Sequence, residues 1–163
     1  MLEQATLDDA AALLGALQAK GLTIATAESC TGGLIAAALT AIPGSSASVL
    51  AGYVTYSNGA KARMLGVAEA TLADHGAVSE PVARQMAEGA RDEAGADIAI
   101  SCTGIAGPGG GSVAKPVGLV FIGCAARGQP SRVERHVFAG DRTAIRAATV
   151  AAAFALIRRT LPE

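Results

Sequence analysis

Apolar residues recur along the chain with two different periods, and segments of each period follow one another in turn. A spacing of three to four residues, as in Ala10, Leu13, Leu14 and Leu17, is typical of the buried face of a helix. Short continuous or alternating apolar runs are typical of strands. We expect helices over residues 6–21, 34–42, 58–66, 67–74, 79–94 and 141–161, and strands over residues 22–27, 48–55, 97–102, 117–126 and 132–138.

This order predicts an α/β protein with a mixed, mostly parallel central sheet, because helices separate most of the strands. Residues 97–102 carry no charge after Asp97, which favours a position at the centre of the sheet. Residues 117–126 and 132–138 are close enough in sequence to form an antiparallel hairpin. The chain has no repeat, linker or low-complexity tract, so we expect a single domain over residues 1–163.

The last expected helix is apolar on two faces. One face carries Ile145, Thr149, Ala152 and Leu156, and the other carries Val150, Phe154, Ile157 and Leu161. One face can pack on the sheet, and the other then needs a cover of its own. We therefore expect a homo-oligomer in which a second subunit covers the last helix.

Composition argues against several classes of function. The net charge is −1 without a basic run, and only 3% of residues are aromatic, so we expect no nucleic-acid partner. Three cysteines without paired spacing fit a reducing, cytoplasmic compartment and argue against a structural zinc site. The acidic N-terminus is not typical of a signal peptide, and the longest apolar run, residues 147–157, is shorter than the roughly 20 residues that span a bilayer.

The strongest candidate for chemistry is the stretch Thr-Ala-Glu-Ser-Cys-Thr-Gly-Gly, residues 26–33, where an expected strand passes into an expected helix. Backbone N–H groups at the start of a helix have no partner within it and can bind an anion. The hydroxyl of Ser29, or the thiol of Cys30, would be a nucleophile with anion stabilisation beside it. An ordinary Ser or Thr N-cap before a glycine turn explains the same residues.

A serine nucleophile needs a base, and the two histidines, His75 and His136, lie in no motif-like setting. A lysine can serve if burial lowers its pKa, and a drop of about 3 units costs about 4 kcal/mol. Lys61 follows the second expected strand, whose carboxyl end should lie at the same sheet edge as Ser29. Ser29 and Lys61 can therefore meet, although a surface lysine is the simpler explanation of Lys61.

Three further features fit the same edge. Thr103 ends the third strand, where its hydroxyl could bind substrate or orient the lysine. The glycine-rich loop of residues 104–112 lacks a Walker A lysine, but its N–H groups could cradle a phosphate. Arg142, beside the expected cap of the last helix, suits an anionic substrate. A strand-end hydroxyl, a plain loop and a solvated arginine are the alternatives.

Six segments, in order along nearly the whole chain, resemble the C-terminal domain of the CinA family. They are TAESCTGG (26–33), VTYSN with the following AK (54–61), HGAVSEPVA (75–83), TGIAGPGGG (103–111), KPVG (115–118) and FAGDR (138–142). Six co-linear matches are far more specific than any one of them. Gly59 and Gly109 depart from the family pattern.

The resemblance implies a three-layer α/β/α fold. It also implies a reaction, because the stand-alone form of this family is a nicotinamide-nucleotide amidase. That reaction is hydrolysis of the carboxamide of nicotinamide mononucleotide to nicotinate mononucleotide and ammonia, with no metal and no cofactor. Ser29 would be the nucleophile, Lys61 its base, and Arg142 would face the phosphate. Tyr56 and Thr103 would assist proton transfer or hold the oxyanion. We also expect substrate contacts from Thr31, Gly32, Gly33, Asn58, Gly104 and Gly107.

Two other functions stay open. The family name suggests a binding or interaction module linked to competence or to the DNA-damage response. The position of Cys30 next to Ser29 suggests a thiol enzyme. Because Ser29, Lys61 and Thr103 occur together in this chain, we favour the serine amidase.

Overall fold

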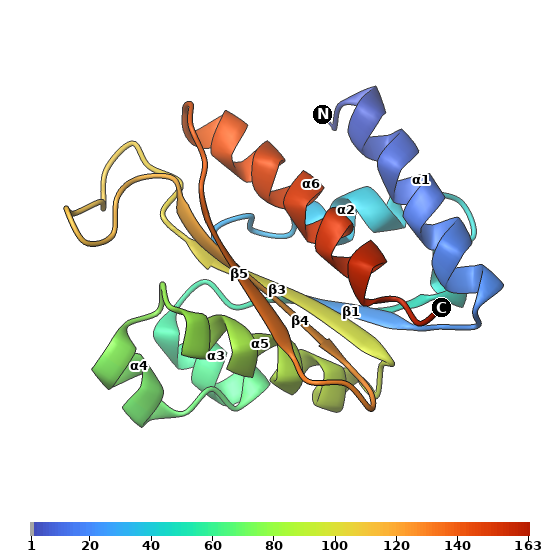
Figure 1. Ribbon diagram of the computed structural model, residues 1–163, viewed down its shortest axis with the longest axis horizontal. Helices are drawn as coiled ribbons and strands as arrows, with labels where there is room; N and C mark the ends of the chain where they lie inside the picture. Colours follow the sequence, from blue (N-terminus) through green and yellow to red (C-terminus); the bar gives the residue numbers. More distant parts are fainter. Residues whose placement is uncertain (1) are drawn as a thin grey trace.

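The computed structural model describes residues 2–163 and contains a five-stranded sheet between two layers of helices (Figure 1). The strands are β1 (Ile24–Glu28), β2 (Val49–Val54), β3 (Ile98–Gly104), β4 (Leu119–Ala126) and β5 (Arg132–Val137). The helices are α1 (Gln4–Ala19), α2 (Leu34–Thr40), α3 (Asn58–Leu65), α4 (Glu69–His75), α5 (Glu80–Ala94) and α6 (Arg142–Thr160), with a 3₁₀ turn η1 (Ser45–Ala47). This three-layer α/β/α arrangement confirms the expected fold class.

The strands lie in the order β2-β1-β3-β4-β5. β1 pairs in parallel with β2 and with β3, whereas β4 is antiparallel to both of its neighbours. The predictions of a central third strand and of a hairpin between the last two strands are confirmed. Every residue of β1, and six of the seven in β3, are buried, which explains their apolar sequences.

Helices α1, α2 and α6 cover one face of the sheet, and α3, α4 and α5 cover the other (Figure 1). Each face has its own buried cluster of apolar side chains. The larger cluster includes Leu13, Ile35, Ile100 and Phe154, and the smaller one includes Leu65, Val82 and Met86.

The expectation that a second subunit covers α6 rested on a wrong premise. α6 packs on β3 and β4, and it also contacts α1 and α2 of the same chain. Val150, Phe154 and Ile157, on its second apolar face, are buried in the larger cluster together with residues of α1. The cover therefore comes from α1, and the apolar pattern of α6 no longer argues for an oligomer.

Two helices start two residues away from their predicted first residue. α1 begins at Gln4, two residues before Thr6, and its N-cap Glu3 makes no side-chain capping bond. α4 begins at Glu69, two residues after the expected start. Local capping patterns fix helix ends only to within a few residues. No helix among residues 2–163 is both long and apolar enough to cross a membrane.

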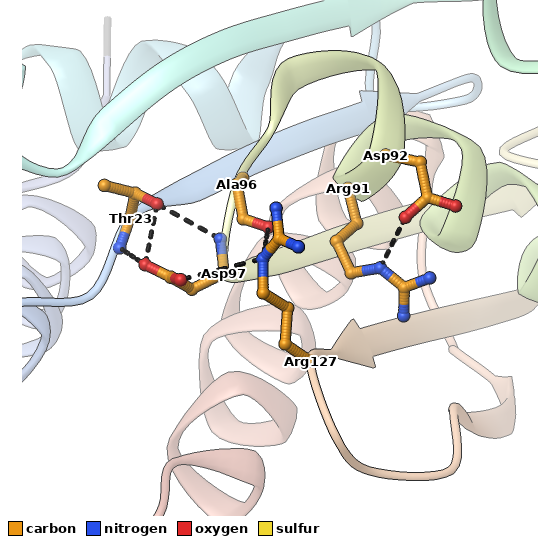
Figure 2. A network of polar contacts seen from close by, with 6 residues as sticks. All are labelled: Thr23, Arg91, Asp92, Ala96, Asp97 and Arg127. Atoms are coloured by element: carbon orange, nitrogen blue, oxygen red, sulfur yellow. Dashed lines mark hydrogen bonds and ion pairs between the residues drawn. The ribbon is translucent and has the colours of Figure 1, made fainter.

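The amino ends of β1 and β3 are tied together by polar contacts (Figure 2). One carboxylate oxygen of Asp97 accepts hydrogen bonds from both the N–H and the hydroxyl of Thr23, each at 2.8 Å. Arg127, just after β4, donates to the carbonyl of Ala96 at 3.1 Å. The bonds from Thr23 hold the pKa of Asp97 below its usual value. These contacts fix the strand register at the amino ends of β1 and β3, at the end of the sheet opposite the candidate site.

At the other end of these strands, the last residues of β1 and β2 are level, and β3 continues two residues beyond them. Glu28 pairs with Val54 on one side and with Cys102 on the other, so the residues that follow these strands are brought together. α3 returns from this edge and packs closely on α5. A Cβ at Gly89, inside α5, would lie 1.9 Å from the carbonyl oxygen of Leu65 in α3, so this approach requires glycine.

Candidate active site

The side chains of Ser29 and Lys61 meet at the carboxyl end of the sheet. Lys61 Nζ lies 3.1 Å from Ser29 Oγ. Ser29 follows β1 directly, and Lys61 lies in α3, which is capped by the hydroxyl of Ser57 accepting a bond from Ala60 N at 3.1 Å. The expectation that Ser29 and Lys61 come into contact is confirmed.

Lys61 is buried, with 1% of its surface exposed. Besides Ser29, its nitrogen donates to the backbone carbonyls of Thr55 at 2.8 Å and Tyr56 at 3.3 Å, and it pairs with no carboxylate of residues 2–163. Burial lowers the pKa of Lys61, and the nearby thiols of Cys30 and Cys102 oppose this shift more weakly. The amine is therefore closer to its neutral, basic form at neutral pH than an exposed lysine would be.

Ser29 and Lys61 lie in the wall of a cavity of about 240 Å³. Its lining consists of Ser29, Cys30, Tyr56, Lys61, Ala77, Val78, Thr103, Gly104, Ala106 and Arg142. A second cavity of about 420 Å³ shares Ala106 and Arg142 with the first and continues along the start of α6. The site is thus a cleft with a smaller compartment at Ser29 and a larger one at Asp141 and Thr143.

Arg142 stands at the junction of these two compartments. One guanidinium nitrogen donates to the carbonyl of Gly107 at 2.9 Å, and another donates to the hydroxyl of Tyr56 at 3.2 Å. Its charge is therefore held at the cleft, where an anionic group of a ligand would meet it. Tyr56 is 62% exposed, and its hydroxyl contacts Arg142, whereas only its backbone carbonyl contacts Lys61.

Thr103 reaches the cavity from the end of β3. Its hydroxyl donates to the carbonyl of Ala77 at 2.8 Å, so its proton is engaged while its oxygen can still accept a bond. Ala77 and Val78 belong to the segment between α4 and α5, which forms one wall of the cavity. Lys115, three residues after the glycine-rich loop, donates to the carbonyl of His75 at 2.7 Å and links the segment that follows this loop to the same wall.

The start of α2 is not free to bind an anion, contrary to our expectation. The carboxylate of Glu28 is fully buried and accepts bonds from the N–H groups of Gly33 at 3.2 Å, Ile35 at 3.0 Å and Ala36 at 2.8 Å. A negative side chain thus already occupies the end of the helix that attracts anions. Anion stabilisation for Ser29 has to come from other groups.

Thr31, Gly32 and Gly33, from which we expected substrate contacts, line neither compartment of the cleft. The buried hydroxyl of Thr31 donates to Glu28 at 2.5 Å, and the N–H of Gly32 donates to the carbonyl of Ser29 at 3.0 Å. Both glycines have positive φ angles, 59° and 105°, which L-residues with side chains rarely adopt. They shape the turn after Ser29 instead of lining the cavity. Ser and Thr do not cap α2 either, since Glu28 does so.

Cys30 is a poor candidate for a nucleophile. It is 5% exposed, and the pKa of its thiol is raised by a hydrogen bond with Cys102 and, to a lesser extent, by burial. A thiol attacks only as its thiolate, which is scarce when the pKa is raised. This geometry disfavours the thiol enzyme.

The other expected residues divide between the cleft and its surroundings. Gly104 lines the cavity, whereas Gly107 contributes the carbonyl that orients Arg142. Asn58 is exposed at the start of α3 and does not line either compartment. His136 lies on β5 against Glu134 and Phe138, away from the lining of the cleft. Within residues 2–163, no group of three or more His, Cys, Asp or Glu side chains is placed to hold a metal ion.

The roles of two side chains beside the site were missed by sequence reasoning. Glu28 holds the start of α2, and Arg146 donates to the carbonyls of Cys30 at 3.2 Å and Thr31 at 2.8 Å. A charged residue at the end of an otherwise apolar strand was the available signal for Glu28. For Arg146 the signal was its place four residues after Arg142, on the same side of a helix.

Comparison with known proteins gives one consistent family. Residues 7–161 match the family described as the CinA C-terminal domain. A "CinA-like protein" of Geobacter sp. strain M21 is 54% identical over 162 residues, which cover 96% of this chain but only 38% of that protein. The chain thus spans about two-fifths of the length of this relative.

A shorter relative and a solved structure match over most of their own length. The Escherichia coli K12 protein named "Nicotinamide-nucleotide amidohydrolase PncC" is 56% identical over 131 residues, covering 80% of this chain and 79% of that protein. The crystal structure of the competence/damage inducible protein CihA from Agrobacterium tumefaciens has a TM-score of 0.95 and 46% identity, over 98% of this chain and 97% of that one.

Proposed function

The chain belongs to the CinA C-terminal domain family, and from this premise we propose that it hydrolyses the carboxamide of nicotinamide mononucleotide. The products are nicotinate mononucleotide and ammonia. The name of the Escherichia coli relative supports the substrate class. The single observation that carries the mechanism is the contact of 3.1 Å between Lys61 Nζ and Ser29 Oγ in the wall of a cleft.

The hydrogen bonds of Lys61 suit a neutral amine that acts as a base. A neutral amine has two N–H bonds and one lone pair. The carbonyls of Thr55 and Tyr56 accept the two N–H bonds, and the lone pair then faces the hydroxyl of Ser29. Burial lowers the pKa of Lys61, which raises the population of this form.

Hydrolysis then takes two steps. Lys61 takes the proton of Ser29 as Oγ attacks the carboxamide carbon, and it returns that proton to the leaving nitrogen as the C–N bond breaks, releasing ammonia. The resulting ester on Ser29 is attacked by a water molecule, whose proton passes to Lys61. Return of this proton to Oγ releases nicotinate mononucleotide and restores Ser29. Thr103 and Tyr56 are our candidates for contacting the substrate amide.

The two compartments of the cleft suit the two parts of the nucleotide. The pyridine carboxamide would lie in the smaller compartment beside Ser29 and Lys61. The ribose phosphate would extend into the larger one, with Arg142 between them and the start of α6 beyond. Three cysteines, free and buried in the described chain, fit a reducing compartment, and we place the reaction in the cytoplasm.

The test is to measure ammonia release from nicotinamide mononucleotide and to identify nicotinate mononucleotide by chromatography. We expect both products in equal amounts, without added metal. The competing function is a binding module linked to competence or DNA damage, and a DNA-binding assay at physiological salt is run beside the first. Binding of DNA without ammonia release would reject the amidase.

A further inference from the structure

Arg146 joins α6 to the turn that carries Ser29. Its Nε donates to the carbonyl of Cys30 at 3.2 Å, and one of its terminal nitrogens donates to the carbonyl of Thr31 at 2.8 Å. These are the two residues that follow Ser29. Among residues 2–163, the carbonyl of Cys30 receives no hydrogen bond other than this one.

The same turn is held on its other side by Glu28. The carboxylate accepts N–H groups of the turn and of the first turn of α2, whereas the guanidinium of Arg146 donates to carbonyls. A buried anion and a partly buried cation therefore fix opposite sides of one short segment. Because the peptide unit is planar, holding a carbonyl also fixes the plane of the bond that bears it.

The turn needs such support because it contains Gly32 and Gly33. Both have positive φ, and glycine has more conformational freedom than any other residue. The side chain of Ser29 itself has one hydrogen-bond partner in the described chain, Lys61. A small rotation of the turn would move Oγ out of line with both Lys61 and the substrate.

We propose that Arg146 is a positioning residue, which holds the Ser29 turn in the geometry needed for attack. The proposal rests on the proposed function in that Ser29 is the nucleophile. Arg146 does not line the cleft. It lines another cavity of about 230 Å³, which shares Thr143 with the larger compartment of the cleft and is otherwise formed by Leu34 and residues at the starts of α1 and α6, so a small cation can reach its place from that side.

The experiment compares wild type, Arg146→Ala and Arg146→Lys, with Arg135→Ala as the matched control. Arg135 is exposed on β5 and makes no side-chain hydrogen bond in the described chain. Two rates are measured: kcat for nicotinamide mononucleotide, and the rate at which a fluorophosphonate phosphonylates Ser29 with release of fluoride. The second rate reports on Ser29 without requiring that the nucleotide be the substrate. Thermal unfolding of each variant shows whether it is folded.

We expect Arg146→Ala to lower both rates by about 100-fold, the usual effect of misplacing a reacting atom by about 1 Å, while KM changes little. Guanidinium ion, well below the concentration that begins to unfold the protein, should restore a measurable part of both rates. Methylammonium should restore less, because it cannot donate to two carbonyls in one plane. Arg146→Lys should fall between wild type and alanine.

A folded Arg146→Ala protein that is phosphonylated at the wild-type rate would overturn the proposal. So would a loss of both rates that parallels a loss of thermal stability and is not rescued by guanidinium, since this marks a purely structural residue. A wild-type Ser29 that does not react with the probe would also overturn it, because there would be no nucleophile to position. Wild-type protein that is phosphonylated at Ser29 but does not hydrolyse the nucleotide would reject the proposed function alone.

Discussion

Lys61 Nζ lies 3.1 Å from Ser29 Oγ, although 32 residues separate them in the sequence. Their contact follows from the parallel pairing of β1 and β2, in which Glu28 is level with Val54. Ser29 leaves β1 at this level, and the chain after β2 turns into α3 and directs Lys61 back toward it. The contact therefore depends on strand register, and a shift of one residue would separate the two side chains.

Replacing Ser29 by alanine should abolish ammonia release and leave the fold intact. The variant loses one hydrogen bond, with Lys61, which contributes about 1 kcal/mol to stability. The measurement is turnover beside thermal unfolding. The control is Cys30→Ser, which should stay active, as should wild type treated with a thiol-alkylating reagent. A Ser29→Ala variant that retains substantial turnover would show that another group is the nucleophile.

Lys61→Arg should be about as inactive as Lys61→Ala. Arginine keeps the positive charge but cannot take the proton of Ser29 near neutral pH. The measurement is kcat and KM for all three proteins, with circular dichroism to establish that each is folded. If Lys61 contributed only its positive charge, the arginine variant would stay active, with mainly a raised KM. That result would show that Lys61 is not the base.

The contribution of Lys61 to the stability of the protein should rise with pH through the window in which Lys61 titrates. Burial holds the pKa of Lys61 in the folded protein below its ordinary value of 10.5. Between the folded pKa and 10.5, the unfolded chain binds more protons than the folded one, so the free energy of unfolding increases with pH. Below the folded pKa the full cost of burying the charge is present.

Lys61→Met removes this titration and is the variant for the measurement. The difference in unfolding free energy between wild type and Lys61→Met should change by at most about 1.4 kcal/mol per pH unit, in favour of wild type as pH rises. Urea unfolding of both proteins over the alkaline range gives this difference, since contributions from groups that do not interact with Lys61 cancel. A difference that does not depend on pH would mean that Lys61 is charged and solvated in the folded state.

The difference between the expected and observed sites has a physical cause. Apolar periodicity predicted the strands, and the rule that parallel strands end at one sheet edge placed Ser29, Lys61 and Thr103 together. The same reasoning located the N–H groups at the start of α2 that have no partner within the helix, but it could not show which group accepts their hydrogen bonds. Glu28 does so from its own strand, because its side chain reaches across a glycine turn whose path only the folded chain defines.

The cover of α6 illustrates a second limit. Periodicity along one helix showed that two faces are apolar, but α1 and α6 lie more than 100 residues apart, and nothing local indicates that they pack together. The role of Arg146 was missed for a similar reason. Its partners are backbone carbonyls, which have no signature in the sequence.

Glu28→Gln should lower the unfolding free energy by about 1–3 kcal/mol. One glutamine oxygen can still accept from Thr31, Gly33 and Ile35, but the amide NH₂ then faces the N–H of Ala36, and neither group can accept. Denaturant unfolding measures the change. The control is Glu93→Gln, on the exposed side of α5, which should stay within about 0.5 kcal/mol of wild type. Equal stability of Glu28→Gln and wild type would contradict the capping role.

Arg142→Ala should weaken catalysis on the mononucleotide more than on the riboside that lacks the phosphate. The phosphate is remote from the carboxamide, and binding energy from such a remote group can orient the amide against Ser29. We expect kcat/KM for nicotinamide mononucleotide to fall by a factor that corresponds to a loss of roughly 2–4 kcal/mol in transition-state stabilisation, the effect of losing a charge-assisted pair. The effect on nicotinamide riboside should be much smaller. Arg142 also contacts Gly107 and Tyr56, so Arg142→Ala removes these two contacts as well as the charge, and their loss needs its own control.

Tyr56→Phe supplies that control, because it removes the contact with Arg142 but leaves the charge in the cleft. Three proteins and two substrates then separate the two roles of Arg142. Reading of the phosphate lowers the mononucleotide rate more than the riboside rate, and it does so only in Arg142→Ala. Loss of a contact between Tyr56 and the amide, which both substrates carry, lowers both rates by one factor in Tyr56→Phe. If Arg142 instead supports the glycine-rich loop through Gly107, its loss lowers the rates on both substrates by one factor, because the loop shapes the cleft whichever ligand enters it. An equal loss on both substrates would therefore assign Arg142 to structure, and the phosphate would have to be bound elsewhere along the start of α6.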